Sequence, residues 1–392
     1  MASGSIDLGQ RMLEKTIEVA IKKEFVENVI IASRRLITRF GSERYNKFKH
    51  CKYLEIQRKY INIYLWELKS QNYYFELQKT SINSLTIPTK ELIKKSIDYI
   101  EELDTAIDIK TPNFNYNKYR IKAIYFEYIK DYNGLLSISQ QAVKDITIPN
   151  YKLTNEIANI YIRIIVAFIQ IGKFHKAIEF GRNVMPDINL GTNSWFRLNY
   201  YLSKAYIYSN DYLSAIKLIL STNKKHLKKY PNYIEIINTI LGYMNLLIDF
   251  KYIIIPVKLI NKMPEFRLGK FLNSVPIYSM DKRGINISIL LMHIAFLLQR
   301  KDYNTIIDRI DSLKQYAYRY LRRDDSFRSN CMIKMVVQMT KADFHPVRTE
   351  RYTADLFKQL KSVNLAGSGE NIEIEVIPFE VLWEIMLKSL KD

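Results

Sequence analysis

Hydrophobic residues recur along this chain at steps of three and four positions, the spacing that places them on one face of an α-helix. In residues 43–69, for example, Tyr45, Phe48, Ile56, Tyr60 and Ile63 follow this spacing. Residues 10–40 show the same amphipathic pattern and predict a second long helix. Only residues 372–377 alternate acidic and apolar positions as a strand does. The pattern therefore predicts an all-α protein with room for one short strand pair near the C-terminus.

A second regularity is a short motif that recurs at intervals of about 40 residues, the length of a helical hairpin. An apolar run ends in a small polar break, an aromatic residue follows, and apolar positions then resume at helical spacing. The aromatic residues are Tyr132, Phe174, Tyr212, Tyr252 and Tyr303. We expect each of them to open the second helix of a hairpin. Because one hairpin cannot bury its apolar face alone, consecutive hairpins are expected to stack into an α-solenoid.

The motif resembles the tetratricopeptide repeat (TPR). In the unit around Tyr212, Ser203 and Ala215 occupy the small-residue positions of that family, and Tyr206 occupies an aromatic position. The unit around Phe174 departs from the family because Ile165 is too large for its position. The resemblance implies a solenoid of TPR-like helix hairpins. The C-terminal half is also similar to uncharacterised helical-repeat proteins of Bacteroidota, a resemblance that implies no function.

These patterns predict three parts of the chain. Residues 1–110 form basic N-terminal helices, residues 111–272 carry the TPR-like repeats, and residues 285–392 form C-terminal helical repeats. The boundary between the last two is a loop that contains Pro276 and Gly284.

The formal net charge of +19 adds a candidate surface. The basic patch, as we define it, comprises Arg34, Arg35, Arg39, Arg44, Lys47, Lys52, Arg58 and Lys59. Aromatic residues interleave with these cations, a combination that can bind single-stranded nucleic acid through stacking and phosphate contacts. Most of the aromatic residues share one helical stripe, however, so we expect them to pack in the core. Nucleic acid, acidic proteins, anionic lipid and simple solvation remain alternatives for the charge.

Motifs for catalysis or cofactor binding are absent from the sequence. It contains no glycine-rich phosphate loop and no His-Glu-x-x-His or Cys-x-x-Cys pair, so we expect no cofactor, no metal site and no enzymatic activity. His293 lies in an apolar run and is expected in the core. Cys51 and Cys331 form no disulfide pattern, the N-terminus has no secretory signal, and no apolar run is long enough to span a membrane. We therefore expect a cytoplasmic protein.

In TPR hairpins the first helices line a concave surface on which peptides dock. With the register above, the resemblance implies that five residues face this surface: Asn117, Arg120, Arg197, Tyr200 and Lys204. Arginine and lysine so placed could hold an acidic peptide or a C-terminal carboxylate. The sequence thus favours a non-enzymatic adaptor or scaffold that binds a protein or peptide. The alternative is a nucleic-acid-associated protein that uses the basic N-terminal helices.

Overall fold

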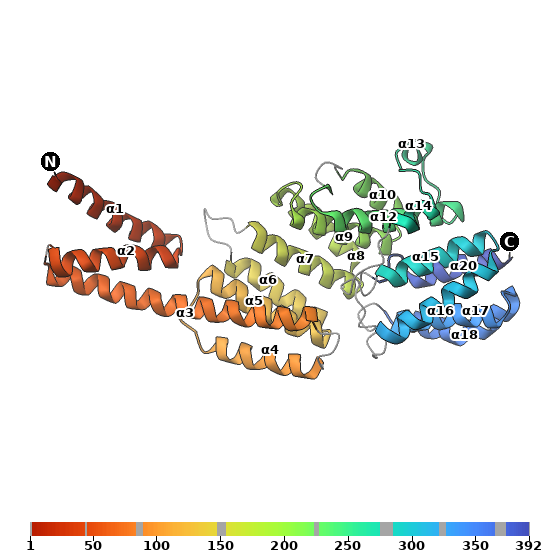
Figure 1. Ribbon diagram of the computed structural model, residues 1–392, viewed down its shortest axis with the longest axis horizontal. Coiled ribbons are helices and arrows are strands. Elements are labelled where there is room, and N and C mark those ends of the chain that lie inside the picture. The colour runs from red at the N-terminus through yellow and green to blue at the C-terminus, as the bar shows by residue number, and fades with distance from the viewer. Residues whose placement is uncertain are drawn as a thin grey trace. The chain divides into compact units, whose positions relative to one another are not determined.

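The computed structural model describes residues 2–43, 45–83, 89–146, 154–222, 227–274, 285–320, 327–364 and 374–391. Within these ranges the chain is α-helical and contains no strand, which confirms the all-α prediction (Figure 1). The predicted strand at 372–377 is wrong where the structure describes it, because residues 374–377 form a turn whose backbone bonds to side chains rather than to a second strand. Residues 372 and 373 lie outside the described ranges.

Packing divides the chain into two compact units, Met1–Ile160 and Tyr161–Asp392. The two units are defined by contacts between residues, whereas the three predicted parts were defined by sequence repeats. The three-part division therefore stays a prediction. In the first unit, α1 (Ala2–Lys22) and α2 (Val26–Thr38) form a hairpin, and the π-helical turn η1 (Arg39–Glu43) leads into α3 (Lys47–Asn83). It continues with α4 (Thr89–Asp104), α5 (Pro112–Ile129), α6 (Tyr132–Ile146) and the start of α7 (Thr154–Gln170).

The long helix α3 organises the first unit. It packs against α2 near its N-terminal half and against α4 and α5 near its C-terminal half (Figure 1). The single helix predicted for residues 10–40 is instead two helices, because Glu24 adopts a left-handed conformation with φ of 57° and reverses the chain. The core of this unit combines aliphatic residues of α2, such as Val29 and Leu36, with aromatic residues of α3 and α5, such as Tyr60 and Phe114.

The second unit continues the succession of helices. Its elements are α8 (Phe174–Val184), the 3-10 turn η2 (Met185–Asp187), α9 (Asn193–Tyr208), α10 (Tyr212–Leu220), α12 (Pro231–Asp249), α13 (Val257–Ile260), α14 (Leu268–Ser274), α15 (Ile285–Gln299), α16 (Tyr303–Tyr320), α17 (Phe327–Lys341), α18 (Pro346–Ser362) and α20 (Phe379–Lys391). Most helices pack on their neighbours in the chain, as a stack of hairpins requires. The last helix departs from this order, because α20 returns to contact α15, α17 and α18. A solenoid arrangement therefore stays a prediction.

One turn recurs throughout the described part of the chain. After each of seven helices a residue adopts a left-handed conformation, and the next backbone N–H donates to the carbonyl five residues earlier. This is the Schellman arrangement, which satisfies carbonyls at the helix end. The left-handed residues are Glu24, Lys130, Gly172, Asn210, Lys251, Lys301 and Asp343. In four of the turns, after α1, α7, α9 and α15, the next helix begins four residues after the last one ends.

The aromatic residues of the sequence motif lie directly after these turns. Helices α6, α8, α10 and α16 begin at Tyr132, Phe174, Tyr212 and Tyr303, which confirms four of the five predicted starts. In three cases an aspartate precedes the aromatic residue, and its carboxylate accepts a hydrogen bond from a backbone N–H of the first turn, as Asp211 does from Ser214 at 3.0 Å. The start predicted at Tyr252 is wrong: the turn at Lys251 is followed by bends at Tyr252 and Ile253 and by irregular backbone, and α13 begins only at Val257.

Candidate functional site

The strongest candidate site lies where α9 meets the beginning of α12. Thr192 caps α9 by accepting a hydrogen bond from the N–H of Trp195, and Pro231 opens α12, where its missing N–H costs nothing. The Phe196 ring stacks on Tyr233 and meets Tyr230 edge to face, each with ring centroids 5.4 Å apart. These aromatic contacts fix the two helix ends beside one another.

A cavity of about 370 Å³ opens between these helix ends. Its lining contains two cations, Arg197 and Lys229, and four tyrosines. The full lining is Asn193, Arg197, Tyr200, Tyr201, Lys229, Tyr230, Pro231, Tyr233 and Ile236. None of these residues is acidic, so the cavity offers positive charge and aromatic surface together. Its volume lies within the range of small-ligand sites, roughly 300–1,000 Å³.

A narrow apolar space adjoins this cavity and shares Tyr200, Tyr233 and Ile236 with it. Its volume is about 20 Å³, room for one water molecule and no more. The shared residues therefore form the inner wall of the larger cavity. A ligand in the larger cavity would contact Tyr200, Tyr233 and Ile236 at this wall.

The structure brings together two of the five predicted binding residues at this cavity, Arg197 and Tyr200. Sequence reasoning missed Tyr201, Lys229, Tyr230 and Tyr233. A signal was present, because Lys229 and Tyr230 directly precede Pro231, a residue that often occupies the first position of a helix. What the sequence lacked was the contact between that helix start and α9.

Two other predicted binding residues, Asn117 and Arg120, lie on α5 in the first unit and contact each other. The Arg120 guanidinium donates to the Asn117 amide oxygen at 3.2 Å and lies 3.1 Å from the centre of the Tyr74 ring. Asn117 is buried. This stacking joins α5 to α3, so the Arg120 side chain contributes to the packing of the two helices.

The fifth residue, Lys204, does not reach a surface, and its prediction as a peptide contact is wrong. Its side chain is fully buried, and its ammonium group donates to the Glu375 carbonyl at 2.5 Å. The Tyr208 hydroxyl donates to the same carbonyl at 2.8 Å. The cause is the turn at residues 374–378, which covers this part of α9.

The Glu375 carboxylate forms a second buried contact within the same turn. Arg328 binds it through two parallel hydrogen bonds of 2.9 and 2.7 Å, and also reaches Glu380 at 2.6 Å. The remaining N–H groups of this guanidinium donate to the carbonyls of Leu360 and Val363. Burial raises the pKa of Glu375, and the bond to Arg328 offsets part of that shift. Every partner is supplied from within the unit, so this network stabilises the fold.

The basic patch lies on α2, η1 and α3 in the first unit. Of the residues predicted for it, Arg34, Arg35, Lys47, Lys52, Arg58 and Lys59 are exposed, Arg39 is half-buried, and Arg44 lies outside the described residues. The aromatic residues among them divide into two pairs. Tyr53 and Tyr60 are buried as expected, whereas Tyr45 and Phe48 are 72% and 80% exposed. The expectation that these aromatic residues pack in the core is therefore wrong for Tyr45, which precedes α3, and for Phe48, which lies about 140° around the helix from Tyr53.

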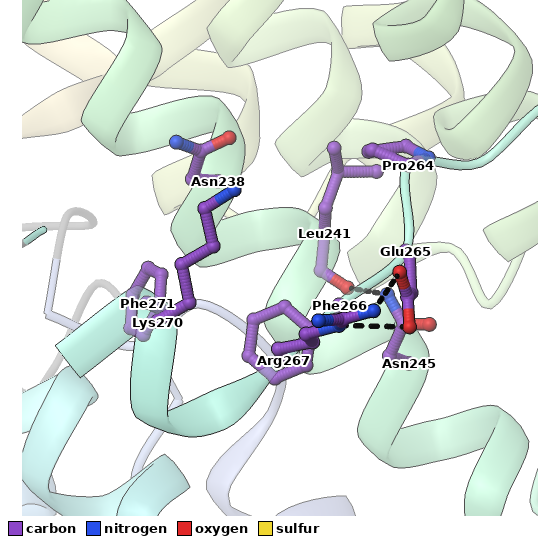
Figure 2. A pocket seen from close by; sticks show the side chains of 9 residues that line it. All are labelled: Asn238, Leu241, Asn245, Pro264, Glu265, Phe266, Arg267, Lys270 and Phe271. Atoms are coloured by element: carbon purple, nitrogen blue, oxygen red, sulfur yellow. Dashed lines mark hydrogen bonds and ion pairs between the residues drawn. The ribbon is translucent and has the colours of Figure 1, made fainter. Parts of the chain in front are cut away.

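Figure 2 shows a further cavity, of about 180 Å³, between α12 and the segment that leads into α14. Arg267 and Glu265 lie at its rim and form two parallel bonds of 2.9 Å. Glu265 and Arg267 neutralise each other, so Lys270 is the one lining cation without a paired acidic residue in the lining. This cavity is also smaller than the cavity at α9, and we regard it as the weaker candidate.

The remaining candidates for chemistry are histidine and cysteine side chains. His293 is buried, as predicted, and burial together with Arg309 and Arg300 lowers its pKa to about 4. Cys331 is buried and Cys51 is exposed. Among the described residues, no three His, Cys, Asp or Glu side chains gather where they could hold a metal ion. None of the described helices combines the length and apolar character needed to cross a bilayer.

Comparison with known proteins identifies no relative. No protein-family model matches the chain, and no curated protein or solved structure matches it either. The TPR-like resemblance therefore rests on the residues of this chain alone.

Proposed function

We propose that this protein is a non-enzymatic adaptor that binds a peptide segment of another protein at the cavity between α9 and α12. The observation that carries the proposal is the lining of that cavity, in which Arg197 and Lys229 lie among four tyrosines with no acidic residue. Arginine binds carboxylates through two parallel hydrogen bonds, and tyrosine adds both ring surface and a hydroxyl donor. An acidic side chain or a C-terminal carboxylate, next to an apolar side chain, fits this combination best.

The test is affinity capture from a lysate of the source organism after nuclease treatment, at moderate salt. The full chain is compared with the double variant R197M/K229M. Loss of both cations is expected to remove a captured protein, because its carboxylate would then be desolvated without a partner. The matched control is R348M/K341M, which also removes one arginine and one lysine from exposed positions of the same unit.

A captured protein lost only from R197M/K229M supports the proposal. A protein captured equally by both variants would place its binding site elsewhere. Material that depends on nucleic acid and disappears as salt rises would contradict the adaptor function and favour the alternative below.

The alternative function is binding of single-stranded nucleic acid by the first unit, and one observation favours it. Tyr45 and Phe48 are highly exposed in the same segment as Lys47 and Lys52. Bases stack on exposed aromatic rings with a gain of about 1–3 kcal/mol each, while cations contact phosphate. In a fluorescence anisotropy titration with a single-stranded oligonucleotide, Y45A/F48A is expected to weaken binding about tenfold or more. Unchanged affinity, or no salt dependence in the wild-type protein, would exclude this function.

A further inference from the structure

The segment between α12 and Pro264 presents an unusual group of exposed apolar side chains. Ile254 is 95% exposed and Val257 is 70% exposed, while Tyr252 and Ile260 are each more than two-fifths exposed. A single exposed apolar residue is ordinary on a protein surface, but four within nine residues mark a candidate interaction surface, which we call the patch. We call residues 251–263 the α13 segment, after the short helix they contain (Figure 1).

Backbone hydrogen bonds tie the start of the α13 segment to α12 and close the turn of α13 itself. The backbone N–H groups of Tyr252 and Ile253 both donate to the Leu247 carbonyl, and those of Leu259 and Ile260 donate to Pro256. Ile255 is buried. Its neighbour Ile254 is exposed, so of these two isoleucines only Ile255 contributes to the core.

The far end of the segment is anchored by aromatic packing. Phe266 lies against α12 (Figure 2). Its ring also stacks on Phe296, with ring centroids 5.5 Å apart. Gly242 permits this approach, because a Cβ atom there would lie 3.0 Å from the Phe266 ring and 2.6 Å from the Met292 sulfur. Both ends of the segment are thus fixed to the helices beneath it, and the patch projects between them.

The charged residues within the α13 segment have one sign, although Asp249 and Glu265 flank it in sequence and Glu384 acts on Tyr252. Lys251, Lys258 and Lys262 are exposed, and the sequence contains no acidic residue from Phe250 to Pro264. Apolar side chains at the centre and lysines at the border are the composition of surfaces that bind the headgroup region of anionic membranes. Lysine suits this place because its long aliphatic stem lies along apolar surface while its ammonium group reaches the phosphate level.

Two other kinds of partner fit less well. Protein interfaces are depleted of lysine relative to the remaining surface and enriched in arginine, yet every cation of the α13 segment is a lysine. Single-stranded nucleic acid binds by stacking on aromatic rings, and Tyr252 is the one aromatic residue of this segment, beside four isoleucines, a valine, a leucine and a methionine. The shape, the residue types and the charge therefore favour a lipid surface.

We propose that the α13 segment docks the protein on a membrane surface that contains anionic lipid. Ile254, Val257 and Ile260 enter the interface between headgroups and acyl chains, Tyr252 lies at headgroup level, and the three lysines contact lipid phosphate and carboxylate groups. The protein lies on the membrane and does not span it. This surface shares no residue with the cavity between α9 and α12, so the two proposals stand or fall separately.

The test is co-sedimentation of the full chain with vesicles of phosphatidylcholine that contain phosphatidylserine, and with vesicles of phosphatidylcholine alone. The protein is expected to bind the first and to bind the second much less. The variant I254S/V257S is expected to lose at least tenfold in partition, since each side chain gives up several buried carbons. The variant K251Q/K258Q/K262Q is expected to lose about a hundredfold, about fivefold for each lysine.

Matched controls separate the proposed site from general charge and exposure. K301Q/K334Q/K341Q removes three exposed lysines from the same unit, and Lys301 shares the left-handed backbone of Lys251. L190S/V347S replaces two exposed apolar residues elsewhere in the unit. All the substituted side chains are exposed, so we expect the thermal unfolding midpoint of each variant to equal that of the wild-type protein. This measurement shows whether each variant is folded.

Loss confined to the α13 variants supports the proposal. No binding of the wild-type protein to either vesicle, or equal loss in the matched controls, would overturn it. If sedimentation velocity instead shows a dimer that I254S/V257S dissociates, the patch is covered by a second copy of the chain and the membrane proposal is wrong.

Discussion

Two cations on α9 have opposite environments in this structure. Arg197 and Lys204 are seven residues apart, close to two helical turns, and so point in similar directions. Arg197 lines a cavity of about 370 Å³, whereas Lys204 is fully buried and donates to the Glu375 carbonyl. The difference comes from a turn 171 residues further along the chain, which covers one end of the helix and leaves the other open. Helical direction alone does not decide whether a side chain can meet a ligand.

The largest expected effect concerns the buried ion pair that fixes this covering turn. The variant R328M leaves the Glu375 carboxylate, which is 1% exposed, without its bidentate partner. Removing one member of a buried pair costs about 3–5 kcal/mol, because a desolvated charge remains. Urea denaturation followed by circular dichroism measures this loss. The matched control, R348M, breaks an exposed pair with Asp343 and should leave the midpoint unchanged. Similar midpoints for both variants would contradict the structural role of the network.

His293 is a second buried ionisable group of this unit. Arg328 stays charged and is paired with Glu375, whereas burial favours the neutral form of His293. Burial, followed by Arg309 and Arg300, lowers its pKa from 6.5 to about 4 in the folded protein. As the pH falls from 6.5 to 4, the unfolded chain gains a proton there that the folded chain does not, so stability falls.

The expected loss is about 3 kcal/mol, at 1.36 kcal/mol for each unit of pKa difference. The check is the free energy of unfolding at several pH values for the wild-type protein and for H293Q. The gap between their two curves should change across this pH range. A constant gap would show that His293 has an ordinary pKa.

The two residues of the opening comparison can be exchanged for methionine directly. K204M leaves the Glu375 carbonyl with one of its two donors and is expected to cost about 1–2 kcal/mol of stability. R197M, at a half-buried position that lines the cavity, is expected to cost less stability than K204M and to weaken binding of a peptide partner. Measuring both properties for both variants tests whether the helix is divided as described. The division fails if R197M is the less stable of the two.

The smallest expected effect concerns the turn that directly follows α9. Asp211 accepts a hydrogen bond from the Ser214 N–H at 3.0 Å and caps α10. Its replacement by alanine is expected to cost about 1 kcal/mol, the usual value for a lost cap. Thermal unfolding of D211A is compared with that of D355A, which replaces an exposed aspartate within α18. Equal shifts in the two variants would show that the cap contributes nothing.

The sequence predicted the features of this fold that depend on neighbouring residues. The aromatic residues Tyr132, Phe174, Tyr212 and Tyr303 open helices because the turn before each is encoded within a few positions. Tyr252 was expected to do the same. It follows the same turn, but Pro256, with neither an N–H nor freedom in φ, lies four residues further on, and no helix forms before it.

Features that depend on distant segments could not be predicted. Periodicity indicates which side of a helix is apolar, but it carries no information about which helix covers that side. Phe48 was expected in the core with Tyr53 and Tyr60, yet it is 80% exposed, because it lies about 140° around the helix from Tyr53. At the candidate site, Arg197 and Tyr200 were predicted from α9 while their partners on α12 were not. The fold class was thus accessible from sequence, and the site only in part.

The repeated turn has a consequence for how such a chain can change in length. In four places a helix ends, a left-handed residue follows, and a new helix begins after a fixed interval of four residues. The turn needs no distant residue for its hydrogen bonds, because its backbone N–H groups donate to carbonyls of the preceding helix. A whole hairpin could therefore be duplicated or deleted between two such turns without redesigning either one. During evolution the turn can stay constant while the sequences of the helices between two turns change.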